Sequence, residues 1–243
     1  MLYNDIIGQL EPKQRLLKMV HEERVPHALL FSGAEGCGNL AAAAAFAQHL
    51  FCTAKTENGA CNHCPSCQKV AKLIHPDLHL VFPIAKSKDV KSSDDLVKEF
   101  REVFLERPYI SLGEWFNELD AENKQPIIPV EQANDILRKL SYTSYEGSYK
   151  IMIIWQPEKM NNEAANKLLK ILEEPPEKTI FILVANYPDQ LLSTILSRVQ
   201  QIPFHACGEE EISLALQKQF GVNADTAKQT AIMSNGNYGE AIH

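Results

Sequence analysis

Residues 28–40 read Ala28-Leu29-Leu30-Phe31-Ser32-Gly33-Ala34-Glu35-Gly36-Cys37-Gly38-Asn39-Leu40, and this stretch decides the fold of the chain. Its first four residues are a short apolar run, typical of a buried strand. The glycines that follow favour a turn. The Ala-rich segment from Leu40 to Phe51 predicts a helix. A strand, a Gly-rich loop and a helix in this order indicate an α/β unit.

The same alternation continues along the chain. Further apolar runs predict strands, and these are 79–82, 150–154, 179–185 and 199–204. Helical patterns lie between and around them, at 5–25, 68–74, 94–105, 130–140, 162–174 and 191–197. Asn161 can cap the fifth of these helices, and Pro175-Pro176 ends it. We therefore expect an α/β fold with a mostly parallel sheet flanked by helices.

The distribution of predicted strands and helices divides the chain into two parts. Residues 1–206 carry the strands, and residues 207–243 carry two helical patterns, at 209–220 and 224–234, which predict a small all-α domain. Within the first part, residues 84–126 are charged and are interpreted as an irregular insertion. Tyr142, Tyr145 and Tyr149 straddle Gly147 and are expected to pack ahead of a strand.

The composition excludes several classes of protein. The 243 residues are 45% hydrophobic and 23% charged, which is typical of globular domains. With 24 Lys and Arg against 31 Asp and Glu, the net charge of −7 is not that of a basic nucleic-acid module. The N-terminus lacks the pattern of a signal peptide, and no apolar stretch is long enough to span a bilayer. We expect a cytoplasmic protein without a membrane partner.

The Gly-rich loop lacks the residues that handle nucleotide. Gly33 and Gly38 have the spacing of a phosphate-binding loop, G-x-x-x-x-G-K-[ST], with Gly36 between them. Asn39 stands where the motif has its Lys, and Leu40 stands where it has the Ser or Thr that ligates magnesium. An amide cannot supply the positive charge of the Lys, and an alkyl group cannot ligate magnesium as a hydroxyl does. The loop is either a degenerate phosphate-binding loop or an ordinary Gly-rich turn.

The second half of an NTPase site is also changed. The strand at 151–154 should end in two acidic residues, but Trp155 and Gln156 follow it. Neither side chain can hold a metal-bound phosphate by charge. Two independent losses in the expected places predict that ATP is not hydrolysed, and they leave open whether it binds.

Four of the six cysteines cluster, as Cys52-x8-Cys61-x2-Cys64-x2-Cys67. Four thiolates at short spacing suit structural zinc, and we expect a small zinc module over residues 52–67. An iron–sulfur cluster and redox-active Cys-x-x-Cys pairs are the alternatives. Cys37 and Cys207 are interpreted as small buried residues.

The chain resembles the clamp-loader branch of the AAA+ ATPases in four segments. These are residues 25–33, the helix Asn166-Lys167-Leu168-Leu169-Lys170-Ile171-Leu172-Glu173-Glu174-Pro175-Pro176, the strand 181–186, and Leu196-Ser197-Arg198-Val199. The motor subunits of that branch keep Lys followed by Ser or Thr in the loop and Asp-Glu after the strand, and this chain lacks both pairs. In this it resembles the delta-prime subfamily of bacterial DNA polymerase III clamp loaders. The family motor places an Arg before an acidic residue and Ala near the C-terminal end of this region, where this chain has Gly239.

The resemblance implies a function. It implies a non-catalytic subunit that works with motor (gamma/tau) and delta subunits, the sliding clamp and primer-template DNA at the replisome. Arg198 would reach a neighbour's ATP as an arginine finger, with Ser197 shaping its turn, although an Arg at a helix end is more often a solvated surface cation. It further implies zinc and a C-terminal collar domain absent from this chain. An active motor ATPase and a zinc-dependent nucleic-acid-binding module are the alternative functions.

Overall fold

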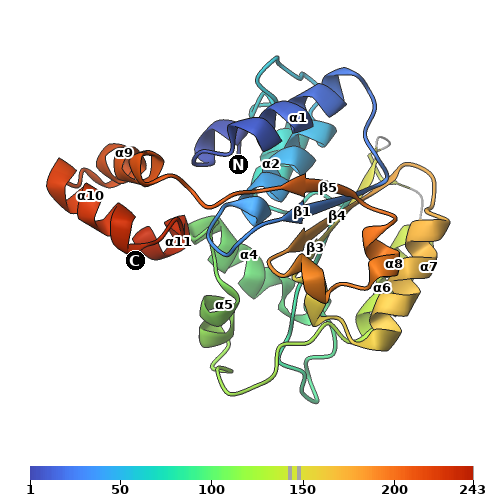
Figure 1. Ribbon diagram of the computed structural model, residues 1–243. Coiled ribbons are helices and arrows are strands. Elements are labelled where there is room, and N and C mark those ends of the chain that lie inside the picture. The colour runs from blue at the N-terminus through green and yellow to red at the C-terminus, as the bar shows by residue number, and fades with distance from the viewer. Residues whose placement is uncertain (142–143, 147–148, 243) are drawn as a thin grey trace.

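The computed structural model describes residues 1–141, 144–146 and 149–242, and five parallel strands form its central sheet (Figure 1). In spatial order the sheet is β2-β3-β4-β1-β5. The strands are β1 (Ala28–Ser32), β2 (Leu78–Val81), β3 (Lys150–Trp155), β4 (Thr179–Ala185) and β5 (Gln200–Pro203). The predicted parallel α/β sheet is confirmed. Tyr142 and Gly147 lie outside the described residues, whereas Tyr145 is exposed and Tyr149 packs against the core.

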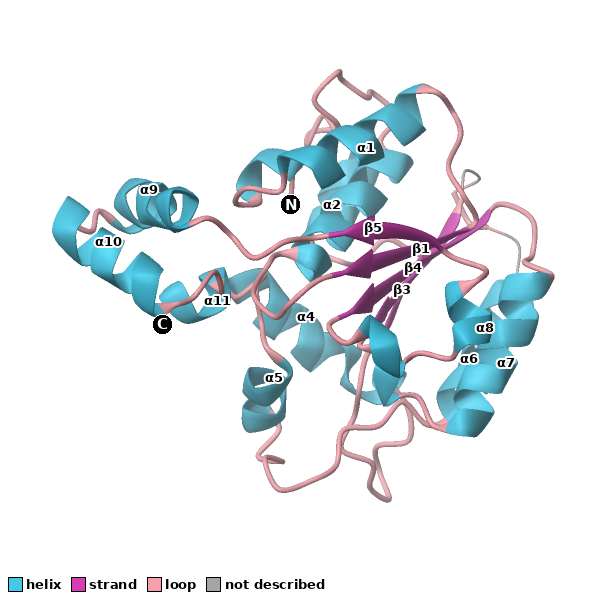
Figure 2. Ribbon diagram, viewed as in Figure 1, coloured by secondary structure: helices cyan, strands magenta, loops and turns pink. Residues whose placement is uncertain are grey.

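Helices cover both faces of the sheet (Figure 2). One face carries α1 (Leu10–His21), α2 (Asn39–Phe51), α3 (Pro65–Ala71) and α4 (Val97–Glu106), and the other carries α6 (Val130–Ser141), α7 (Asn162–Glu173) and α8 (Ser193–Leu196). Alternate residues of β1 divide between the two cores: Leu29 and Phe31 face α2, and Ala28 and Leu30 face α7. Because both faces are covered, β1, β3 and β4 are apolar almost throughout, as the sequence indicated, whereas the edge strand β5 carries Gln200 and Gln201.

Local signals explain where the helix after β3 begins and ends. The Asn161 side chain accepts a hydrogen bond from the Ala164 N–H at 2.8 Å, which is the predicted N-cap. The helix ends at Glu173, just before Pro175-Pro176. We call the part of the chain before residue 207 the body. It also contains single 3-10 turns, which are η1 (Tyr3–Asp5), η2 (Ser93–Leu96), η3 (Pro157–Lys159) and η4 (Pro188–Gln190).

The insertion at 84–126 contains more helix than the sequence predicted. Besides the expected helix α4 it contains α5 (Leu112–Glu118), which the Ser111 and Glu114 side chains cap reciprocally. Its ends are joined by paired backbone hydrogen bonds between Ile84 and Ile127, at 2.9 and 3.2 Å. Trp115 is fully buried, and its indole N–H donates to the Pro83 carbonyl at 2.9 Å.

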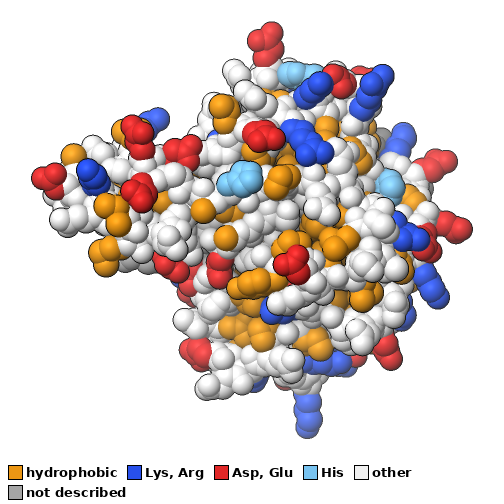
Figure 3. Space-filling model, viewed as in Figure 1, with side chains coloured by type: hydrophobic (Ala, Val, Ile, Leu, Met, Phe, Trp, Pro, Cys, Tyr) orange, Lys and Arg blue, Asp and Glu red, His pale blue; other side chains and the backbone are white. Residues whose placement is uncertain are grey.

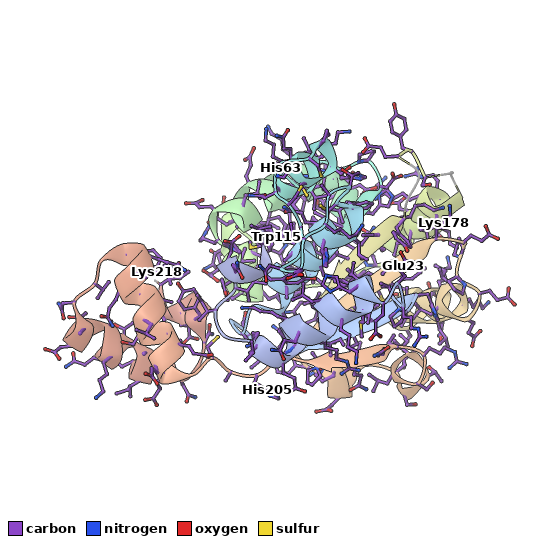
Figure 4. The ribbon with its side chains drawn as sticks, turned by 90° about the horizontal axis from the view of Figure 1, so that it is seen from above. Glu23, His63, Trp115, Lys178, His205 and Lys218 are labelled. Carbon is purple, nitrogen blue, oxygen red and sulfur yellow. The ribbon has the colours of Figure 1, made fainter. Side chains whose placement is uncertain are left out.

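The C-terminal helices stand to one side of the sheet (Figure 1). These are α9 (Glu209–Phe220), α10 (Ala224–Met233) and α11 (Tyr238–Ala241), and we call them the lid. Figure 4 shows His205 on the segment that joins the lid to the body, and several acidic side chains mark the lid in Figure 3. The lid has its own apolar cluster, which also includes Tyr109 of the insertion. Among the described residues, no helix is long and apolar enough to cross a membrane.

Candidate functional site

The Gly-rich loop lies where β1 ends and α2 begins, at the carboxyl edge of the sheet. Parallel α/β sheets bind ligands at this edge. The Gly33 N–H donates to the Ala185 carbonyl at 3.1 Å, which ties the loop to the end of β4. Gly36 has a φ of +72°, a left-handed conformation that L side chains rarely adopt. The glycines of residues 33–40 therefore form a tight turn that is tied to the end of β4.

The two substituted positions of the loop face the interior. Asn39 is 5% exposed, and its Nδ2 donates weakly to the Gly33 carbonyl at 3.4 Å and to Asn186 Oδ1 at 3.3 Å. Leu40, in the first turn of α2, is buried in the core. The Asn39 side chain thus joins the loop to the end of β4, and it offers no cation to a phosphate.

The end of β3 has become part of the hydrophobic core. Trp155 is 2% exposed, and its ring lies 5.6 Å from that of Phe100, between ring centroids. Gln156 is buried with a φ of +56°, and no hydrogen-bond partner for its Oε1 is found in the part of the chain that the structure describes. The carboxylates of an NTPase would point from this edge toward a metal-bound phosphate. Here the corresponding position is filled by an aromatic contact.

The space between the loop and the insertion is small, whereas a cavity of about 850 Å³, lined by Ile7, Tyr109 and Tyr238 among others, lies between the N-terminal segment and the lid. Pro108, Tyr109 and Ile110 of the insertion lie over the loop, and together with Gly38 and Trp155 they leave a cavity of about 10 Å³. That volume is room for about one water molecule. The Glu35 carboxylate accepts the Leu112 N–H at 2.9 Å, and burial raises its pKa despite that bond. Sequence reasoning gave the insertion no role at this site, and no local pattern marks Tyr109 as part of it.

The two spare cysteines are buried beside the loop and the lid. Burial raises the pKa of the Cys37 thiol to about 12 and that of Cys207 to about 11. Both thiols therefore stay protonated at neutral pH, in keeping with their interpretation as small packing residues.

Arg198 directly follows α8, one of the helices on the sheet face that α6 and α7 also cover, and it lies at the surface. Its guanidinium pairs with Glu173 at 2.8 Å and donates to the Thr194 carbonyl, also at 2.8 Å. It also donates to Ser197 Oγ at 3.1 Å, and that hydroxyl donates to the Thr194 carbonyl at 3.0 Å. The Arg198 side chain is 36% exposed, so the guanidinium lies at the surface, held by Glu173, Thr194 and Ser197. Ser197 and Arg198 thus form one hydrogen-bonded turn.

The four clustered cysteines come together in space. Their sulfur atoms all lie within 4.8 Å of one another, and Cys61 and Cys67 are 3.9 Å apart between sulfurs. Backbone N–H groups of Cys61, Cys64 and Cys67 point at the sulfurs of Cys52, Cys61 and Cys64, at 3.3 to 3.5 Å. Such donors favour thiolates.

The donor set fits zinc. A Zn–S bond of about 2.3 Å places the sulfurs of a tetrahedral site about 3.8 Å apart. His63, which Figure 4 labels, donates from Nδ1 to the Cys61 carbonyl at 2.9 Å and helps fix the loop. Four thiolates occupy every position of a tetrahedral ion, so the ion would have a structural role.

Comparison with known proteins places the chain in a family. Residues 8–207 match the family described as DNA polymerase III, delta subunit. The chain belongs to this family. A DNA polymerase III subunit delta' from Bacillus subtilis is 31% identical over 240 residues, which are 97% of this chain and 59% of that protein. Another, from Pseudomonas aeruginosa, is 29% identical over 214 residues, 86% of this chain and 53% of that protein.

The family relationship extends to the tau subunit. DNA polymerase III subunit tau of Bacillus subtilis is 28% identical over 202 residues, 83% of this chain and 29% of that protein. The chain is a member of the delta-prime type, and it spans little more than half the length of the two delta' relatives.

A solved structure confirms the AAA+ type of fold. The Holliday junction branch migration motor RuvB of Thermotoga maritima superposes with a TM-score of 0.57 and 14% identity, over 99% of this chain and 61% of that one. At that identity the likeness concerns the fold alone. It includes the lid as well as the sheet, because nearly the whole chain is covered.

Proposed function

We propose that this chain is a non-catalytic subunit of a DNA polymerase III clamp loader. In this function it assembles in the cytoplasm with gamma/tau motor and delta subunits and helps to load the sliding clamp on primer-template DNA. The observation that carries the proposal is a contrast between two sites. The loop that would handle nucleotide is closed by the chain itself, whereas Arg198 remains at the surface.

The chemistry of the loop supports the absence of catalysis. Hydrolysis requires a cation on the transferring phosphoryl group and a carboxylate that holds magnesium. Asn39 and Leu40 supply neither group in the loop, and Trp155 and Gln156 supply neither at the end of β3. A motor function would require all four positions to be compensated by other residues. We propose that none of these residues binds a cofactor.

Arg198 is the proposed contribution to a neighbour's site. An Arg presents a planar fork of N–H donors that matches phosphate oxygens, and it is always charged. The hydrogen bonds of Ser197 and Thr194 set the direction of this fork, and Glu173 holds it while no phosphate is near. A phosphate carries more negative charge than one carboxylate, so it can displace Glu173.

The remaining assignments complete the proposal. Cys52, Cys61, Cys64 and Cys67 would bind zinc, which fixes a surface module and takes no part in catalysis. Residues 1–206 are proposed as the AAA+ domain, with the module at 52–67 and the insertion at 84–126. Residues 207–243 are proposed as the lid domain.

Turnover of ATP by the assembled complex tests the proposal. Complexes of the protein with its motor subunits, delta, clamp and primed DNA are compared for wild type, Arg198→Ala, Arg198→Lys and Glu173→Gln. Arginine fingers are worth about 10³- to 10⁵-fold in kcat, so Arg198→Ala should abolish the share of turnover due to the neighbouring site.

The matched variants separate the finger from general damage. Arg198→Lys keeps the charge and loses the fork, so it should recover only a small part of that share. Glu173→Gln removes the ion-pair partner and leaves the arginine, so turnover should be kept. Full ATPase activity and clamp loading with Arg198→Ala would contradict the role of Arg198.

A further inference from the structure

The insertion is anchored at both ends, and its middle lies over the Gly-rich loop. Its stem is fixed by the paired hydrogen bonds between Ile84 and Ile127. Phe100 of the insertion stacks on Phe82, which follows β2, at 4.1 Å and meets Trp115 edge-on at 5.2 Å, between ring centroids. This aromatic core lies against the sheet. The segment after α4, which starts at Arg107, is therefore held in a defined position.

Tyr109 is the residue that the insertion places on the loop. It is 8% exposed, and its ring lies so close to Gly38 that a Cβ there would stand 2.9 Å from Cε1 of the tyrosine. Its hydroxyl accepts the Ile7 N–H at 2.8 Å, which connects the insertion to the N-terminal segment. Tyr109 therefore occupies the region over the loop where a phosphate-binding loop would hold its ligand.

The lid closes on the same residue from the other side. The rings of Tyr109 and Tyr238 meet edge-on, with centroids 4.8 Å apart, and Tyr109 belongs to the apolar cluster of the lid. The Tyr238 N–H donates to the Gly36 carbonyl at 3.2 Å. A Cβ on Gly36 would fall 1.6 Å from Asn237 Oδ1, so the start of α11 rests directly on the loop.

Gly239 makes this contact sterically possible. A Cβ at this position would stand 2.8 Å from the Tyr109 carbonyl oxygen, which is backbone and cannot rotate away. Any larger residue would push the lid and the insertion apart. The close contact between the lid and the insertion therefore needs both Tyr109 and a glycine at position 239.

We propose that Tyr109 acts as an internal ligand, which takes the place of a nucleotide between the loop and the lid and holds the lid in one orientation. Three segments meet on this side chain: the loop at 33–40, the lid at 237–239 and the N-terminal segment at Ile7. A nucleotide would join the loop and lid only while bound, whereas Tyr109 is covalently part of the chain. The subunit therefore keeps one arrangement of body and lid regardless of the nucleotide concentration. Tyr109 is a positioning residue.

Hydrogen exchange on the intact chain tests this inference. In Tyr109→Ala, the amides of residues 36–40 and 238–242 should exchange about tenfold faster or more, because an aromatic pair and a hydrogen bond are lost there. The amides of β1, β3 and β4 should keep their wild-type rates. Phe116→Ala is the matched control, since Phe116 is a buried aromatic of the same insertion that does not line the site.

The control and a second variant make the result decisive. Phe116→Ala should change the exchange at 36–40 and 238–242 by less than about twofold, whatever its effect on overall stability. Gly239→Ala keeps Tyr109 but should reproduce the faster exchange, because its Cβ meets the Tyr109 carbonyl. The inference is overturned if Tyr109→Ala and Gly239→Ala leave these amides protected, or if Phe116→Ala exposes them equally.

Discussion

Replacing Trp155 by Asp, which restores an acidic residue at the end of β3, should unfold the protein rather than return a metal ligand. Trp155 is 2% exposed and packs against Phe100 on the face of the sheet that α4 covers. The carboxylate would have to enter this aromatic core. The position that a motor would use for magnesium is here required for stability.

The cost follows from the burial of the side chain. Truncation of a buried Trp costs about 3 to 5 kcal/mol of unfolding free energy. A carboxylate without a partner in the same place adds about 1 to 3 kcal/mol or more. The sum, about 4 to 8 kcal/mol or more, is comparable with the whole unfolding free energy of a typical domain, about 5 to 15 kcal/mol. Trp155→Phe keeps an aromatic ring and should lose only about 1 to 2 kcal/mol.

Urea unfolding followed by circular dichroism and fluorescence measures this difference. Trp115 remains as the fluorescent reporter, because the chain has 2 tryptophans and the other one is replaced. If Trp155→Asp unfolded with a free energy within about 1 kcal/mol of Trp155→Phe, the side chain at 155 would not be packed as described, and the argument against a metal-binding β3 would fail.

Two further predictions concern the cysteine cluster and the partly buried His79 of β2. Metal analysis should find about one zinc per chain, and labile sulfide or visible colour would contradict zinc. Cys64→Ser or a strong chelator should expose residues 52–67 to protease while the sheet stays folded. The reason is that the cluster packs almost no apolar side chains besides the cysteines. Burial, with Lys139 and Lys150 nearby, lowers the pKa of His79 to about 4, while Asp77 and Asp94 oppose the shift. Because the unfolded chain then binds more protons between pH 4 and 6.5, His79 should remove up to about 1.4 kcal/mol of unfolding free energy per pH unit as the pH falls through that range. His79→Gln should flatten this slope in urea titrations, and an unchanged slope would show that folding does not lower the pKa of this imidazole.

Much of the site could be predicted because its signals are local. The strand, Gly-rich loop and helix at 28–51 follow from residue type and spacing alone, and the N-cap at Asn161 follows from one side chain and the helix after it. The loss of charge at Asn39 and Trp155 is visible in the sequence for the same reason. None of these predictions needs a contact between distant parts of the chain.

The closed state of the site could not be predicted, because it depends on contacts between distant segments. Tyr109 lies 102 residues from Ile7 and is far along the chain from Tyr238, and no periodicity connects them. The Ser111-x-x-Glu114 signal could have located α5 and shown that the insertion is ordered. It would not have shown where the insertion lies, since that depends on packing against the sheet.

A titration of the isolated protein with Mg-ATP tests the central claim most directly, namely that the chain handles no nucleotide of its own. A ligand present at 100 times its Kd would add about 2.7 kcal/mol of stability, enough to raise the Tm by about 5 °C or more. Since the space over the loop is a cavity of about 10 Å³, we predict a Tm shift below about 1 °C and no turnover at millimolar Mg-ATP. A saturable rise in Tm, or turnover by a preparation free of motor subunits, would contradict the account.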